Sequence, residues 1–194
     1  MISKKNKILL IGSTAKSIYN FRGDLIDEIT SKKHDVHVAT SIGNLYDQSK
    51  ISQMNITFHQ LNFQNNKISL FKDLFFLFGI LKLINKIKPD KVISYTLKPV
   101  IYSGLCLLFF NNKISYFPIL TGLGHIFNSN NFKIRIISFL VKILLRISLI
   151  RSNKLIFHNK DNLSYFNKKI FRNNKSIIIL GSGVNMNKFK YCPP

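Results

Sequence analysis

Short apolar runs alternate with longer helical patterns along almost the whole chain, and this alternation constrains the fold more than any other feature. The run from Lys7 to Ile11 ends at Gly12, as a buried central strand would. Parallel strands are joined by helices, so the alternation predicts an α/β fold, a parallel sheet with helices on both faces. Further strands are predicted at His34–Thr40, Ile56–Leu61, Asp90–Thr96, Lys113–Ile119, "KLIFHN" and "KSIIIL".

The predicted helices carry recognisable start signals. Asn20 is expected to cap a first helix that places Phe21, Leu25 and Ile29 on one face. No internal repeat and no Gly/Ser-rich linker interrupts the pattern, which indicates a single domain. The other helices are predicted at Leu70–Ile87, from Pro99 to about Phe110, at Phe132–Ser152 and at Asp161–Phe171.

The formal net charge of +21 admits several partners. A basic surface binds nucleic acid, an anionic membrane or small anions such as phosphates, but a Lys- and Asn-rich composition produces charge without any of them. Basic clusters interleaved with aromatic residues on a recognisable module are missing, so nucleic acid is not an expected partner. The spacing of Cys106 and Cys192 fits no metal site, and we expect no metal and no cofactor.

The same sequence contains no uninterrupted apolar run of about 18 residues, so no membrane-spanning helix is predicted. The first apolar run is too short for a signal peptide. Two distant cysteines with no disulfide framework fit the reducing cytoplasm.

Ligands of parallel α/β sheets bind beyond the carboxyl ends of the strands. The loops expected at that edge are Gly12–Tyr19, Thr96–Pro99, Thr121–Phe127, His158–Asp161 and Gly181–Asn185. In the first of them, Gly12, Ser13 and Thr14 would let a phosphate or sugar approach the backbone near a helix N-terminus. Arg22 adds a fixed charge there; the alternative is a tight turn with a surface arginine. The spacing is not that of a dinucleotide-binding loop.

The later loops each have two interpretations. Lys98 lies at a helix N-terminus, which disfavours a cation unless it meets an anion, and surface lysines are common. In "TGLGHIF", His125 is either a polar contact of a sugar pocket or a structural histidine. The turn "GSGVN" is either part of a cleft or a hinge.

The helix predicted at Phe132–Ser152 places Arg135, Ser138, Lys142 and Arg146 on one narrow stripe. Nearly all its other residues are apolar, more than one contact with a sheet would bury. Either protein covers the excess, or the basic stripe borders an anionic bilayer into which the apolar residues dip.

Six segments in order resemble the N-terminal half of glycosyltransferase family 4 enzymes, and the match extends over essentially the whole chain. They are "SIYNFRGDLIDEI", "HDVHVAT", "KPDKVISYTLKPVIYSGL", "TGLGHIF", "LIFHNKDNLSYF" and "IIILGSGVNMNKF". The subgroup they resemble extends a polyprenyl-diphosphate-linked bacillosamine with N-acetylgalactosamine. The resemblance implies a Rossmann-like domain that is one half of a GT-B architecture, and a metal-independent retaining transferase.

The resemblance also implies roles for particular residues and a domain organisation. Residues 1–190 would form the acceptor-side domain and 191–194 the start of a linker, with the nucleotide-sugar-binding domain absent, so turnover by this chain alone is not expected. The implied acceptor-binding residues are Gly12, Ser13, Thr14, Asn20, Arg22, Thr96, Lys98, Thr121, Gly122 and Gly124. The implied residues of the interdomain cleft are His125, Gly181, Ser182, Gly183 and Asn185.

Two functions remain open. The first is the acceptor-binding half of a retaining transferase that moves a sugar from a nucleotide sugar to a lipid-linked acceptor in cell-surface glycan synthesis. The second is a non-catalytic subunit of a split enzyme that binds a lipid-linked sugar or a membrane. Either would be cytoplasmic and peripherally attached to the anionic inner face of the plasma membrane, through Arg135, Lys142 and Arg146.

Overall fold

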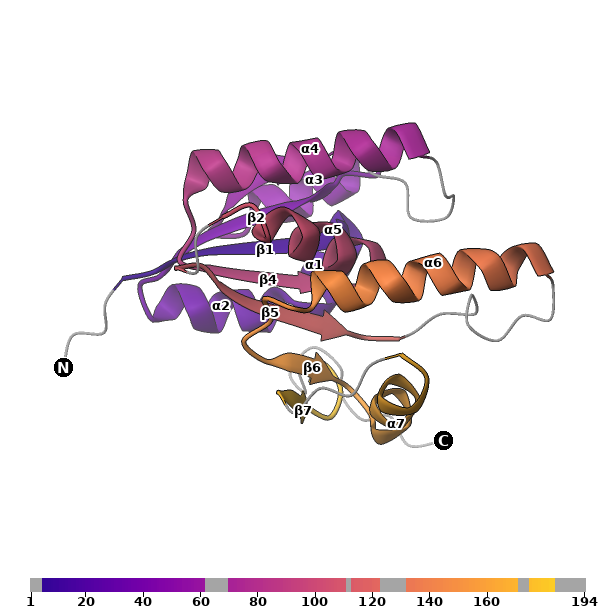
Figure 1. Ribbon diagram of the computed structural model, residues 1–194. Coiled ribbons are helices and arrows are strands. Elements are labelled where there is room, and N and C mark those ends of the chain that lie inside the picture. The colour runs from indigo at the N-terminus through magenta and orange to yellow at the C-terminus, as the bar shows by residue number, and fades with distance from the viewer. Residues whose placement is uncertain (1–4, 62–69, 111–112, 123–131, 171–174, 184–194) are drawn as a thin grey trace, which may run out of the picture.

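The computed structural model describes residues 5–61, 70–110, 113–122, 132–170 and 175–183. These residues form a seven-stranded sheet in the order β3-β2-β1-β4-β5-β6-β7 (Figure 1). Every pair of neighbouring strands is parallel, which confirms the predicted fold class. The strands are β1 (Lys7–Thr14), β2 (Asp35–Ser41), β3 (Thr57–Gln60), β4 (Lys91–Tyr95), β5 (Ser115–Leu120), β6 (Leu155–Phe157) and β7 (Ser176–Ile178).

Helices cover both faces of the sheet, because successive residues of its strands point to opposite sides and both sides are apolar. In β1, Leu10 packs with the first set of helices while Leu9 and Ile11 pack with the second, and all three are fully buried. The first set is α1 (Ala15–Phe21), α2 (Gly23–Ser31) and α3 (Leu45–Ser52). The second set is α4 (Leu70–Ile87), α5 (Leu97–Leu107), α6 (Phe132–Ser148) and α7 (Lys160–Lys169).

Two adjacent helices of the second set approach at backbone distance. A Cβ at Gly104 of α5 would overlap the carbonyl of Ser148 at the end of α6. Ser148 is fully buried, as is Leu145 one turn earlier. The glycine at position 104 therefore allows the C-terminal end of α6 to lie directly against α5.

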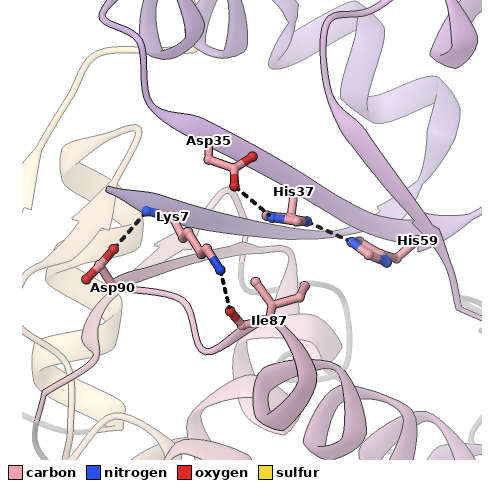
Figure 2. A network of polar contacts seen from close by, with 6 residues as sticks. All are labelled: Lys7, Asp35, His37, His59, Ile87 and Asp90. Carbon is pink, nitrogen blue, oxygen red and sulfur yellow. Dashed lines mark hydrogen bonds and ion pairs between the residues drawn. The ribbon is translucent and has the colours of Figure 1, made fainter. Parts of the chain in front are cut away.

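Polar contacts tie together the strands toward their amino ends (Figure 2). The Lys7 backbone N–H donates to Asp90 Oδ2 over 2.8 Å, just before β4 begins. His37 Nδ1 and His59 Nε2 lie 2.9 Å apart in β2 and β3, and His37 Nε2 lies 3.4 Å from Asp35 Oδ2. Burial, then the neighbouring His37 and Lys86, lower the pKa of His59. Of these contacts, the one between His37 and His59 joins β2 to the edge strand β3.

The start of the first helix differs from the prediction. Thr14, not Asn20, caps it: Thr14 Oγ1 accepts from the Ser17 N–H over 3.2 Å, and Asn20 is an exposed residue inside α1. Phe21 and Leu25 are exposed, and Ile18 and Ile26 are the buried residues. The reason is a break at Arg22, whose φ of −128° ends α1 and starts α2 in a new direction.

Two further helix predictions were incomplete. α3 was not predicted, because Leu45–Ser52 is mostly polar and buries only Asp47 and Ile51. α6 ends at Ser148 rather than Ser152, since the following residues turn into a bridge between Ser152 and Tyr116 of β5. Within the residues that the structure describes, no helix combines the length and apolar character needed to cross a membrane.

Candidate functional site

The strand order reverses between β1 and β4, and in open parallel sheets this is the place where ligands bind. Gly12 lies near the carboxyl end of β1, Thr96 directly follows β4, and Thr121 directly follows β5. Gly181 follows β7 after a short extension. All four thus lie at one edge of the sheet, as the sequence predicted. Gly122 is at the same edge, whereas Gly124, His125 and Asn185 fall outside the described residues.

A tyrosine, rather than open space, lies against Gly12. A Cβ on Gly12 would overlap the phenol of Tyr95, with Cε1 2.6 Å away. Tyr95 is 2% exposed and its hydroxyl lies 2.7 Å from Ser17 Oγ. Because Ser17 Oγ–H donates to the Thr14 carbonyl, the Tyr95 hydroxyl is the donor to Ser17. Burial raises the pKa of Tyr95 to about 12, so the phenol is neutral at physiological pH.

Arg22 lies on this tyrosine at the junction of α1 and α2. Its guanidinium carbon is 4.8 Å from the centroid of the Tyr95 ring. Nη1 donates to the Phe21 carbonyl over 3.1 Å and to Ser182 Oγ over 3.0 Å. Nη2 lies 3.3 Å from His158 Nε2. Arg22 therefore joins the α1–α2 junction to the end of β4 and to the residues that follow β6 and β7.

The charge of Arg22 is buried, and the residues that the structure describes supply no counterion for it. The residue is 4% exposed, and no Asp or Glu of the described chain forms an ion pair with it. Nε has no hydrogen-bond acceptor among the described residues. Burial lowers the pKa of Arg22, although Tyr95 acts in the opposite direction. An uncompensated buried cation is costly, and an anion at this point would remove that cost.

His158 was not singled out from the sequence, although its loop was. Its Nδ1 lies 3.0 Å from the carbonyl of Ile179, which can only accept, so Nδ1 carries the proton and Nε2 the lone pair. That lone pair faces Arg22 Nη2. The contact joins residues 136 positions apart, so no local pattern could have revealed it. A histidine directly after a strand at the ligand edge was the only available signal.

Thr96 has strained backbone geometry at the same edge. Its φ of 67° and ψ of 156° lie in a region that is essentially restricted to glycine. Its Oγ1 is buried and has no hydrogen-bond partner among the described residues. A β-branched residue held in this way is a strong outlier. Thr96 is the residue next to Tyr95, so the strain lies beside the Arg22 cluster.

Lys98, by contrast, already has its anion. Nζ lies 3.0 Å from Asp73 Oδ1, and the two side chains are 18% and 11% exposed. The pKa of Tyr102 is raised, first by burial and then by the charge of Asp73 and a hydrogen bond to it. The cation at the start of α5 is therefore stabilised by a carboxylate of α4, which accounts for Lys98 without a ligand.

The cations predicted to face a membrane lie along one border of α6. Arg135 is exposed, Lys142 is half-buried, and Arg146 Nε donates to the Ile170 carbonyl. Ser138 is buried and belongs to the face that packs on the protein. The exposed face of the helix is apolar and consists of Phe132, Ile136, Phe139, Leu140, Leu144 and Ile147.

Comparison with known proteins finds one curated relative at significant similarity. A curated relative from Campylobacter jejuni, an N,N'-diacetylbacillosaminyl-diphospho-undecaprenol alpha-1,3-N-acetylgalactosaminyltransferase, is 24% identical over 185 residues. The alignment covers 94% of this chain and 48% of the relative, so the chain spans about half the relative's length.

Two solved structures share the fold. A glycosyltransferase from Rickettsia africae has a TM-score of 0.66 at 20% identity, covering 96% of this chain and 45% of its own. A sucrose-phosphate synthase from Thermosynechococcus elongatus has a TM-score of 0.65 at 10% identity, covering 90% and 48%. The family model described as glycosyl transferase 4-like matches residues 7–159, most of the described sheet, and the chain belongs to this family.

Proposed function

We propose that this chain is the acceptor-binding half of a retaining glycosyltransferase that adds a sugar to a polyprenyl-diphosphate-linked glycan. Residues 1–190 form the acceptor-side domain in this proposal, and a nucleotide-sugar-binding domain or partner chain completes the enzyme. Membership of the family supports glycosyl transfer. The Campylobacter relative, whose name specifies a diphospho-undecaprenol acceptor, supports the kind of acceptor.

The observation that carries the proposal is the buried guanidinium of Arg22 at the ligand edge. Within the described part of the chain, Arg22 has no carboxylate partner, and its Nε–H has no acceptor. A diphosphate supplies the missing negative charge and acceptor oxygens. Further acceptor-side residues of the proposal at the same edge of the sheet are Gly12, Ser13, Thr14, Thr96, Thr121 and Gly122.

Peripheral attachment to a membrane is part of the same proposal. A polyprenyl-linked acceptor stays in the bilayer, so its enzyme has to reach the headgroup layer. In Figure 1 the N-terminal part of α6 extends beyond the strand ends on the side of the ligand edge. Its exposed face carries Phe132, Ile136 and Phe139. Arg135 and Lys142 border that face, as expected for a helix lying on an anionic cytoplasmic leaflet.

Binding of the acceptor tests the function directly. The chain is mixed with liposomes that contain bacillosaminyl-diphospho-undecaprenol, and retention is compared with liposomes that contain undecaprenol alone. We expect selective retention, weakened about ten- to hundredfold by Arg22→Gln, because a charge-assisted hydrogen bond is lost. Equal retention on both liposomes would contradict the proposal.

A fusion separates the enzyme half from a non-catalytic subunit. The chain is joined to the second half of the Campylobacter relative and supplied with acceptor and nucleotide sugar. The acceptor-half proposal expects a product with the α anomer that the relative's name specifies. Acceptor binding without transfer by a folded fusion would favour the lipid-linked-sugar-binding subunit instead.

A further inference from the structure

The N–H groups of the Arg22 guanidinium differ in how well their hydrogen bonds are satisfied. Nη1 has two acceptors of ordinary length, the Phe21 carbonyl at 3.1 Å and Ser182 Oγ at 3.0 Å. On the side-on edge, Nη2 has one long contact of 3.3 Å with His158, and Nε has no acceptor among the described residues. Nε and Nη2 are the parallel pair of donors with which arginine binds two oxygens of a phosphate or carboxylate.

His158 occupies part of that edge as a neutral acceptor. The Ile179 carbonyl, 3.0 Å from Nδ1, fixes the proton on Nδ1 and leaves the Nε2 lone pair pointing at Nη2. One nitrogen cannot serve two parallel donors, so Nε stays unsatisfied while the imidazole is in place. An imidazole also brings no negative charge to balance the guanidinium.

Two of the side chains that contact the Arg22 guanidinium reach the surface. Arg22 is 4% exposed, whereas His158 is half-buried and Ser182 is exposed. Ser182 belongs to a turn in which Gly181 and Gly183 both have positive φ, 69° and 78°. Movement of the His158 side chain would uncover the edge, while the Phe21 carbonyl and the stacked Tyr95 ring keep the guanidinium oriented.

We propose that the Nε/Nη2 edge of Arg22 is a bidentate site for one phosphate oxyanion, and that His158 is a placeholder which the anion displaces. The proposal rests on the proposed function for its physiological ligand, the diphosphate of the lipid-linked acceptor. No covalent step is involved: one hydrogen bond from Nη2 to His158 breaks, and two form from Nε and Nη2 to phosphate oxygens. Free phosphate or a nucleoside diphosphate offers the same chemistry, so the test includes each.

The readout is the Nε–H cross-peak of Arg22 in a ¹H–¹⁵N spectrum of the whole chain, assigned by its loss in Arg22→Lys. The probes are P1,P2-dimethyl diphosphate, inorganic phosphate and uridine diphosphate. We expect dimethyl diphosphate to shift this cross-peak and to slow its exchange with water. A larger response to uridine diphosphate than to dimethyl diphosphate would indicate a nucleotide-binding site and would contradict its assignment to the lipid-linked acceptor.

Variants of His158 test the placeholder. His158→Leu removes the competing acceptor, and we expect dimethyl diphosphate to bind about fivefold more tightly, because no internal hydrogen bond has to break. His158→Gln keeps an acceptor and should bind as the parent does. His34→Gln, at the opposite end of the sheet beside Asn6, is the matched control. If the folded His158→Leu chain binds dimethyl diphosphate no more tightly than the parent, His158 is a structural residue and its proposed role as a placeholder is wrong.

The wild-type spectrum decides the site even if His158→Leu does not fold. An Nε–H signal that stays unchanged at saturating dimethyl diphosphate overturns the anion site. If lipid-linked acceptor still binds in that case, the proposed function stands and this inference alone fails. If the signal shifts but the lipid-linked acceptor does not bind, the oxyanion site stands and the proposed function fails.

Discussion

Gly12 and Gly23 lie on either side of the first helix and differ in what surrounds them. At Gly12 a Cβ would overlap the buried Tyr95 ring, whereas at Gly23 it would meet no atom within 4 Å. We expect Gly12→Ala to lower the free energy of unfolding by about 1–3 kcal/mol through overpacking. Gly23→Ala, at the first position of α2, should be neutral or raise it by up to about 1 kcal/mol. Urea unfolding measures both, and equal stabilities would show that Tyr95 moves aside freely.

Tyr95 should make stability depend on pH in the alkaline range. Its pKa is about 12 in the folded chain, raised by burial, and about 10 when unfolded. The folded state therefore holds the proton more tightly, so this contribution is complete below pH 10 and is lost as the pH rises through 12. We expect it to amount to about 3 kcal/mol.

Comparison with Tyr95→Phe isolates this contribution, since Tyr102 and Tyr116 remain in both chains. At neutral pH the variant should be about 1 kcal/mol less stable, because the hydrogen bond to Ser17 is lost. That deficit should shrink and then reverse between pH 10 and 12. A deficit that stays constant in urea titrations across this range would rule out Tyr95 as the titrating group.

The residues of the candidate site differ in how far the sequence could predict them. Arg22 was predicted as a site residue because its charge lies beside the loop after the first strand, and Ser182 because the resemblance implied it. Their mutual contact over 160 positions, and the role of His158, depend on how the sheet brings distant loops together. Tyr95 was counted only as the end of a strand, since no local pattern shows that its ring fills the space over Gly12.

At the scale of elements, α4 and α5 are joined by the ion pair of Asp73 and Lys98. Lys98→Met would leave the Asp73 carboxylate largely buried beside Tyr102. We expect this change to lower the free energy of unfolding by about 2–3 kcal/mol. The double variant Lys98→Met/Asp73→Leu should recover most of the loss, because it leaves no uncompensated charge. Thermal and urea unfolding check both, and a double variant less stable than the single one would contradict the account.

The elements themselves were predictable where their apolar pattern is strong. β1, β2, β4 and β5 bury nearly every residue in their central parts, so short apolar runs located them. α3 buries too few side chains to leave a pattern, and only its cap at Asn44, which accepts from the Asp47 N–H over 2.8 Å, marks its start. α1 was missed because Gly12–Tyr19 was predicted as a loop, so the first helix was expected to begin at Asn20 and the break at Arg22 was not foreseen.

At the scale of the whole molecule, the parallel sheet followed from the order of elements alone, because parallel neighbours require a crossover each time. The order of elements does not show which face of α6 is exposed. The sequence predicted a basic stripe on α6 that borders apolar residues; the structure buries Ser138 of that stripe, while the apolar residues beside its cations are exposed. The cations lie on the border between the two, with Arg146 bound to the Ile170 carbonyl.

This arrangement predicts a bilayer interaction with separable apolar and electrostatic parts. The triple variant Ile136→Ser/Phe139→Ser/Leu140→Ser should abolish flotation with vesicles at any salt concentration, because these exposed side chains supply the burial. Arg135→Gln should weaken binding only to anionic vesicles at low salt, by about 1 kcal/mol. Arg146 is left unchanged, since its substitution would also break the contact with Ile170.

The matched control is Leu45→Ser/Tyr46→Ser, which removes exposed apolar side chains of α3. If the α6 triple variant floats as well as this control, the apolar face of α6 does not supply the membrane burial, and the bilayer interaction proposed for this face is wrong.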